Sequence, residues 1–272
     1  MKKIIYFLLV LPLFIASCKP SAHEMALSEI EKTKLFIAEK QDSAALACID
    51  SIHVRYRTDV AVRRMADTLR WDIEYRHAIN TLPQIDSALN QLQSQLPKLT
   101  KPFRFIKNEE YQTIGSFEHS QLRTENNISR CYLKPSINEY GKFTLTSYYL
   151  GSKAQHTTVR ATVDSLSVET LIAPSSNISQ FTDVDHYKEI IIYDNELLNN
   201  IHSFIADNRD NRIKISLLGD GQPYHYYLTP TERNILAQSY ELSIALTNLN
   251  RLTDQQLRLS QKIELLKMRL NK

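Results

Sequence analysis

Side chains that could bind a metal ion are scattered along this chain of 272 residues. The tightest group is Asp183-Val184-Asp185-His186, whose carboxylates and imidazole are ligand types that divalent cations prefer. One segment supplies too few ligands for a closed site, so we interpret it as a solvated loop before a strand. The run from Asp207 to Asn211 lacks the glycine and the distal glutamate of calcium-binding loops, and a helix-to-strand turn explains it more simply. We therefore expect neither a metal ion nor another cofactor.

Groups for nucleophilic or acid–base catalysis are equally sparse. No serine stands in a Gly-x-Ser-x-Gly setting, and only five glycines occur in the chain, which argues against phosphate-cradling loops. Glu109, Glu110 and Glu118 could perform acid–base chemistry, but an exposed strand edge carries the same residues. The sequence predicts no catalytic residue.

An aromatic run, Tyr224-His225-Tyr226-Tyr227, is the densest aromatic group outside the helical segments. In a strand, Tyr224 and Tyr226 face one side and His225 and Tyr227 the other. One side would join the core and the other would form a binding strip, because aromatic side chains supply large contact area at low entropic cost. Ordinary packing of all four residues is the alternative.

The N-terminal segment predicts a covalent modification. Lys2 and Lys3 precede an apolar run from Ile4 to Phe14, and Ile15-Ala16-Ser17 leads to Cys18. This is the pattern of a bacterial lipoprotein signal peptide over residues 1–17, with lipid attached to Cys18 after cleavage. The run is shorter than the roughly 20 residues of a spanning helix, so we expect a membrane anchor followed by a tether over residues 18–24.

The charge balance argues against one class of partner, and the cysteines raise the question of a disulfide. The chain has 33 Lys and Arg against 30 Asp and Glu, and two of the lysines lie in the signal segment, so the mature surface is close to neutral. This argues against nucleic acid as a partner. Cys48 and Cys131 could form a bridge in an oxidising compartment, but two separate buried thiols are the favoured interpretation.

Helical periodicity dominates residues 25–101. Helices are predicted over Met25–Glu39, with Asp42 capping the next at Ser43–Tyr56, and from Asp59 towards Pro97. Pro83 lies inside the third pattern without changing its phase. We expect a kink or local break at residues 79–82 rather than a domain boundary.

Two heptad seams predict a helical stalk. The C-terminal segment 229–272 opens with a capping Thr229, Pro230 and Glu232. Antiparallel packing would place Leu96 near Leu242 and Trp71 near Leu266, whereas a dimer through the last helix is the alternative. The seam positions are Trp71, Tyr75, Ala78, Leu82, Ile85, Leu89, Leu92 and Leu96 in the first helix, and Leu242, Ala245, Leu249, Leu252, Gln256, Leu259, Ile263, Leu266 and Leu270 in the second.

Residues 102–228 carry strand signals instead, because β-branched and aromatic residues alternate with turns. Hairpin turns are predicted at Asn138–Gly141 and Leu218–Gly221, and one amphipathic helix over Asn195–Asp207. The expected fold class is α+β, with N-terminal helices and a long C-terminal helix in an antiparallel coiled-coil-like stalk and an inserted, mainly antiparallel β domain. The expected strands are 129–133, 143–150, 157–163, 166–172, 189–193, 213–218 and 224–228.

Several motifs resemble those of known families. The segment from Ile37 to Leu46, followed by Ile49, Ile52 and Tyr56, resembles one tetratricopeptide-type helical pair, which a further helix must cover. A recurring tripeptide, Asp followed by Ser or Thr and a small or aliphatic residue, resembles the O-glycosylation signal of exported Bacteroidota proteins. Its hydroxyl residues are Ser43, Ser51, Thr68, Ser87 and Ser165; the alternative is ordinary helix-start chemistry.

Taken together, the chain resembles uncharacterised envelope lipoproteins of Bacteroidota. The residues that carry the resemblance are Cys18 with its signal, Asp50-Ser51-Ile52, Glu110 to Gly115, Leu145 to Ser152 and Tyr240 to Ser243. Lys19 to Glu24 lack the acidic cluster that, by this resemblance, directs such lipoproteins to the cell surface. The resemblance implies an outer-membrane protein that faces the periplasm.

Two functional hypotheses follow. The first is a non-enzymatic, membrane-anchored scaffold or interaction protein whose partner is an envelope protein or a cell-wall component. The second is an enzyme or a receptor for a small ligand or glycan, with its site in the β domain. Few glycines, long seams and the lack of reactive motifs favour the first.

Overall fold

The structure is a computed structural model that describes residues 21–152, 154–182, 187–194 and 196–271. Long helices and antiparallel sheets confirm the predicted α+β class. The chain forms two compact units, residues 1–82 with 259–272 and residues 83–258. This division differs from the expected one at residues 25–101, 102–228 and 229–272, because the two long helices each contribute to both units.

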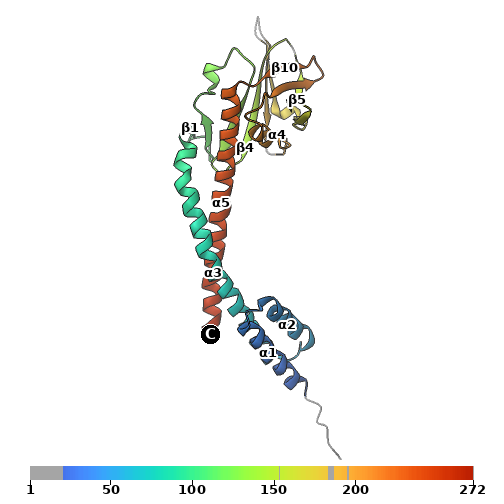
Figure 1. Cartoon of the computed structure of the whole chain (residues 1–272), viewed down its shortest axis with the longest axis vertical. Coiled ribbons are helices and arrows are strands. Elements are labelled where there is room, and N and C mark those ends of the chain that lie inside the picture. The colour runs from blue at the N-terminus through green and yellow to red at the C-terminus, as the bar shows by residue number, and fades with distance from the viewer. Residues whose placement is uncertain (1–20, 153, 183–186, 195, 272) are drawn as a thin grey trace, which may run out of the picture. The chain divides into compact units, whose positions relative to one another are not determined.

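The first unit is built from helices. They are α1 (Ala22–Ala38), α2 (Asp42–Arg55) and the beginning of α3 (Val60–Thr100). Helices α1 and α2 lie side by side (Figure 1), and the expected covering helix is α3, which contributes to the same core. The buried core residues are Ala26, Ile30, Ala45, Ile49, Ile52, Val62, Ala66 and Ile73.

Side chains cap the starts of α1 and α3, but the cap predicted for α2 is wrong. Ser21 and Glu24 form a capping box at α1, and Asp59 accepts from the Val62 amide at 3.1 Å at the start of α3. Asp42 was expected to cap α2, but Gln41 stands at that position and makes no side-chain cap. The Asp42 carboxylate instead contacts two α3 side chains, the Arg76 guanidinium at 3.2 Å and the His77 imidazole at 2.9 Å.

Helix α3 continues through Pro83, so the local break expected at residues 79–82 is absent. Proline lacks the N–H that would bond the carbonyl of Ile79. The side chains of Ile79 and Pro83 are both exposed, so water can reach this carbonyl and reduce the cost. The division between the compact units nevertheless falls between Leu82 and Pro83.

The predicted antiparallel pairing of α3 with α5 (Pro230–Leu270) is found in each unit. In the first unit, Arg269 lies 5.3 Å from the centre of the Trp71 ring and Lys262 lies 2.9 Å from Glu74. In the second unit, the seam residue Gln256 donates to Asp86 at 2.7 Å. The polar seam position therefore has a partner across the helix pair.

Two antiparallel sheets lie in the second unit. The six-stranded sheet has the order β1-β2-β3-β4-β8-β7, and the four-stranded sheet has the order β10-β9-β5-β6. Strands β1, β2 and β7 were not predicted. The bounds are β1 (Phe103–Ile106), β2 (Ser116–His119), β3 (Tyr132–Asn138), β4 (Phe143–Gly151), β5 (His156–Val163), β6 (Leu166–Glu169), β7 (Ile178–Thr182), β8 (Tyr187–Tyr193), β9 (Lys214–Gly219) and β10 (Tyr224–Tyr227).

One hydrophobic core joins both sheets, α4 (Ile201–Asp207) and the first half of α5. Helix α4 is shorter than the predicted Asn195–Asp207, because Asn199 and Asn200 adopt positive φ angles of 41° and 65° and the helix begins only after them. The β3–β4 hairpin turn is confirmed, and Gly141 supplies its positive φ of 84°. The hairpin of β9 and β10 is also confirmed.

Two further properties concern the described residues. None of their helices is both long enough and apolar enough to cross a membrane. Cys48 and Cys131 are free thiols, and each is half-buried. The bridge considered above is therefore not formed.

Candidate interaction surface on strand β10

Strand β10 is an edge of the four-stranded sheet and pairs only with β9 among the described residues. The Leu228 amide donates to the Ile213 carbonyl at 3.0 Å, which makes this pair a hydrogen-bonded one. Hydrogen-bonded pairs alternate in antiparallel ladders, so the main-chain groups of His225 and Tyr227 point away from β9. The edge thus presents N–H and C=O groups that an added strand can bind.

The same two residues expose their side chains on one face of the sheet. His225 forms a 2.9 Å hydrogen bond with the Ser216 hydroxyl of β9. Tyr227 is 49% exposed, and the guanidinium carbon of Arg212 lies 3.9 Å from the centre of its ring. Lys214 is the register partner of Tyr227. We call His225, Tyr227, Arg212 and Lys214 the β10 surface.

The other two aromatic residues lie on the opposite face of β10, where Tyr226 is half-buried and Tyr224 is 36% exposed. Tyr226 packs against the main core, and the Tyr224 ring meets the Tyr149 ring edge-on at 5.2 Å. A hydrogen bond to the Cys131 thiol and burial raise the pKa of Tyr224, so its hydroxyl stays neutral. Burial raises the pKa of Tyr226 well above its ordinary value. Tyr226 thus packs partly on the core, whereas Tyr224, His225 and Tyr227 are exposed.

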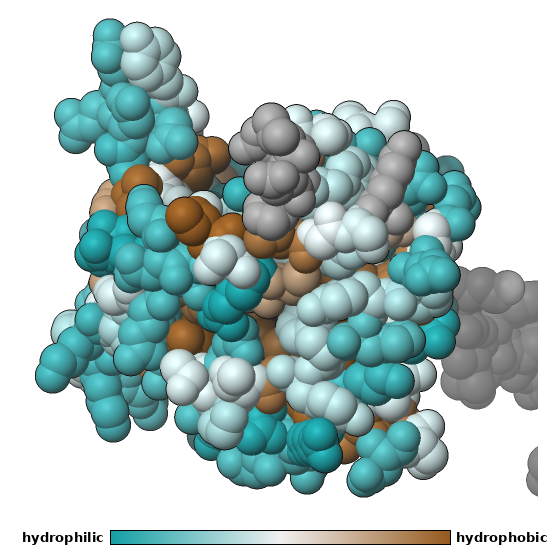
Figure 2. Space-filling model, turned by 90° about the horizontal axis from the view of Figure 1, so that it is seen from above, coloured by the Kyte–Doolittle hydropathy of each residue, from teal (hydrophilic) through white to brown (hydrophobic). Residues whose placement is uncertain are grey.

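The β10 surface carries positive charge without a matching carboxylate. In the described part of the chain, Arg212 and Lys214 make no ion pair, whereas the neighbouring Arg160 is neutralised by Glu169 at 2.6 Å. On the face drawn in Figure 2, hydrophobic side chains appear in separate small areas between polar ones, without one large patch. The two unpaired cations favour a polar, charge-assisted contact at the β10 surface.

A second arrangement was not found from the sequence. Ser147 of β4, His156 of β5 and Glu189 of β8 form a buried hydrogen-bonded row that links the two sheets. The Ser147 hydroxyl lies 3.1 Å from His156 Nε2, and His156 Nδ1 lies 2.5 Å from the Glu189 carboxylate. Nucleophile, base and acid stand in this order in hydrolase triads.

Burial decides the role of this row. All three side chains are almost completely inaccessible, so a substrate cannot reach the Ser147 hydroxyl in this structure. Burial raises the pKa of Glu189, but hydrogen bonds from the His156 side chain and amide more than offset this and hold it below its ordinary value. The Gln155 amide also donates to Glu189, at 2.7 Å. The row therefore acts as a polar tie between the sheets.

The remaining predicted sites lie apart from the β10 surface. Cys18 and the Asp183–His186 group lie outside the described residues. Among the residues that are described, no three His, Cys, Asp or Glu side chains converge as metal ligands. Of the predicted O-glycosylation sites, the half-buried one is Ser51, and the exposed ones are Ser43, Thr68, Ser87 and Ser165.

Comparisons of the chain with protein-family models, with curated proteins and with solved structures found no match.

Proposed function

We propose that this protein is a lipid-anchored, non-enzymatic interaction protein of the bacterial envelope. The lipid is attached at Cys18, and the protein faces the periplasm from the outer membrane. The β10 surface binds an extended, acidic segment of another envelope protein. The observation that carries this proposal is the strand edge itself, where unpaired main-chain groups, an exposed tyrosine and two unpaired cations lie together.

The exposed groups of the β10 surface indicate what kind of segment it binds. Main-chain groups of His225 and Tyr227 bind an extended backbone, while Arg212 and Lys214 attract its carboxylates. The edge strand has only four residues, so the added strand forms few hydrogen bonds and the complex depends on charge. We expect a contact that weakens as salt concentration rises.

Affinity capture with the full chain tests the proposal. The double variant His225→Ser/Tyr227→Ser removes the exposed side chains. Phe181→Ser is the matched control, because Phe181 is a 55% exposed aromatic residue on β7, an edge strand of the six-stranded sheet. A partner from solubilised envelope should bind the wild type and the control but not the double variant. Retention by the double variant, or equal loss from Phe181→Ser, would contradict the assignment.

A further inference from the structure

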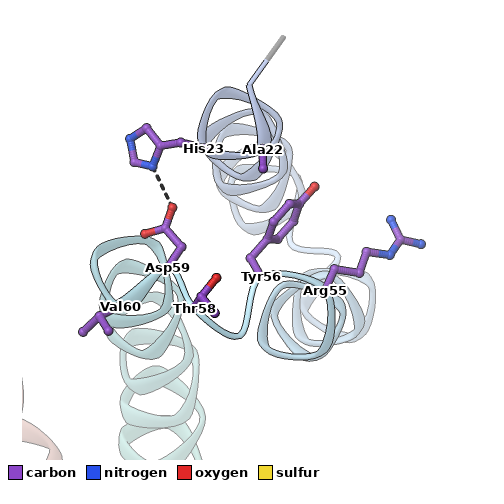
Figure 3. Close-up of a pocket in the computed structure, with 7 residues that line it drawn as sticks. All are labelled: Ala22, His23, Arg55, Tyr56, Thr58, Asp59 and Val60. Carbon is purple, nitrogen blue, oxygen red and sulfur yellow. Dashed lines mark hydrogen bonds and ion pairs between the residues drawn. The ribbon is translucent and has the colours of Figure 1, made fainter. Parts of the chain in front are cut away.

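Three helix ends meet at one end of the first unit. Helix α1 begins at Ala22, α2 ends at Arg55 and α3 begins at Val60. His23 Nδ1 lies 2.6 Å from the Asp59 carboxylate and links α1 to α3, as Figure 3 shows. A pocket of about 460 Å³ opens between these ends. We call residues 22–25 and 54–64 the helix-end face.

The helix-end face is rich in arginine side chains that lack a close carboxylate partner. Arg57 and Arg64 are exposed and have no carboxylate partner in the described chain, and Arg55 has only a long 3.8 Å pair with Glu29. The first turn of α3 contains no acidic residue but ends in Arg63. Cations at a helix N-terminus oppose the helix dipole, so helix stability does not explain this charge.

The two carboxylates of this face, Glu24 and Asp59, accept hydrogen bonds from groups within the same unit. Glu24 accepts from the Ser21 amide at 2.7 Å in the α1 capping box, and hydrogen bonding to Ser21 lowers its pKa. Asp59 caps α3 and binds His23, and these hydrogen bonds lower its pKa as well. Four arginines, Arg55, Arg57, Arg63 and Arg64, outnumber these two carboxylates, so the net charge of the face is positive.

Exposed apolar side chains stand beside these cations. Val60 is 59% exposed at the start of α3, and Val54 is 62% exposed in the last turn of α2. Met25 is also exposed in the first turn of α1. Apolar side chains next to arginines form the kind of surface that enters a lipid headgroup layer, where the apolar groups insert and the guanidinium groups bind phosphates.

The segment between Cys18 and α1 is so short that a lipid on Cys18 keeps this face close to the membrane. Cys18 lies three residues before Ser21, which caps α1. Three extended residues span at most about 10 Å, so a lipid on Cys18 holds the start of α1 next to the headgroups. A longer tether would leave the face free of such a constraint.

We propose that the helix-end face lies on the membrane surface, with Val54 and Val60 in the headgroup layer and Arg55 and Arg57 on phospholipid phosphates. This inference rests on the lipid anchor of the proposed function. It adds a second attachment, so the membrane surface is a binding partner of the first helical unit rather than only the site of its anchor. Each arginine adds about fivefold to the affinity for an anionic surface.

Quenching of tryptophan by brominated lipids tests the contact. The full, lipidated chain is reconstituted in vesicles of phosphatidylethanolamine and phosphatidylglycerol, with Trp71→Phe removing the only native tryptophan. Val60→Trp reports on the helix-end face. Leu35→Trp is the matched control, because Leu35 is 63% exposed in the last turn of the same helix α1, about 20 Å along its axis from Ala22.

We expect brominated lipid to reduce the fluorescence of Val60→Trp at least twofold and to leave Leu35→Trp unchanged. Arg55→Glu/Arg57→Glu should reduce the quenching of Val60→Trp, whereas the exposed Arg104→Glu in β1 should not. Absent quenching at Val60→Trp, or equal quenching at both positions, would overturn the proposal in a sample whose lipidation is verified by mass spectrometry. Absence of lipid on Cys18 would instead refute the anchor, and this inference with it.

Discussion

Replacing Glu189 with Gln tests the assignment of the buried row as a tie between the sheets. The carboxylate accepts from the Gln155 amide at 2.7 Å, the His156 amide at 3.1 Å and His156 Nδ1 at 2.5 Å. A glutamine has one oxygen and one NH2 group in the same space, so its best orientation still turns the NH2 group towards the Gln155 N–H.

The expected cost combines two losses. One buried donor is left without an acceptor, which costs about 1–3 kcal/mol, and two charge-assisted hydrogen bonds become neutral, at roughly 1 kcal/mol each. The total is about 4 kcal/mol. At about 2–4 °C per kcal/mol, the melting temperature should fall by roughly 8–16 °C.

Thermal and urea unfolding of the full chain measures this loss. Glu241→Gln is the matched control, because Glu241 forms an exposed pair with Arg209 and should change stability by less than about 0.5 kcal/mol. The pKa of Glu189 is lower in the folded state than its ordinary 4.5, so its stabilisation is present above that value and is lost as pH falls through the lowered pKa. A Glu189→Gln variant within about 1 kcal/mol of the wild type would refute the tie.

The remaining predictions concern the anchor, the helix pair and the β10 surface. Cys18→Ser should leave the precursor without lipid and uncleaved, which mass spectrometry and fractionation detect. Truncation before Leu242 should unfold the N-terminal helices, and retention of full helicity and melting temperature by circular dichroism would show that the seam pairing is dispensable. Pro83→Ala should stabilise the chain by about 2 kcal/mol in urea unfolding, because it restores an N–H to the helix. The His225→Ser/Tyr227→Ser variant should lose less than about 2 kcal/mol, since both side chains are exposed, and a larger loss would place them in the core.

Local signals explain why the long helices were predictable. The start of α5 is encoded in adjacent residues, as Thr229 accepts from the Glu232 amide at 3.2 Å while the Glu232 carboxylate accepts from the Thr229 amide at 2.9 Å. The heptad period then fixes the face that meets α3. In contrast, β1 and β7 are short, largely exposed edge strands with no clear alternation, and their strand conformation depends on pairing with β2 and β8.

The candidate site shows the same difference between local and long-range information. The aromatic run from Tyr224 to Tyr227 and its two faces follow from composition and the period of a strand. The role of Arg212 does not, because its contact with Tyr227 arises only when β9 folds back along β10. The row of Ser147, His156 and Glu189 joins three strands of two sheets, and no local spacing predicts it.

Site-specific photo-crosslinking in living cells tests the central claim most directly. A photoreactive phenylalanine analogue at Tyr227 places the probe on the β10 surface, and the same analogue at Phe181 is the control on β7, an edge strand of the six-stranded sheet. We expect one discrete adduct with an envelope protein from position 227, reduced by the substitutions Arg212→Glu and Lys214→Glu, and no such adduct from position 181. An unmodified chain at position 227, or the same adduct from both positions, would contradict an interaction through β10.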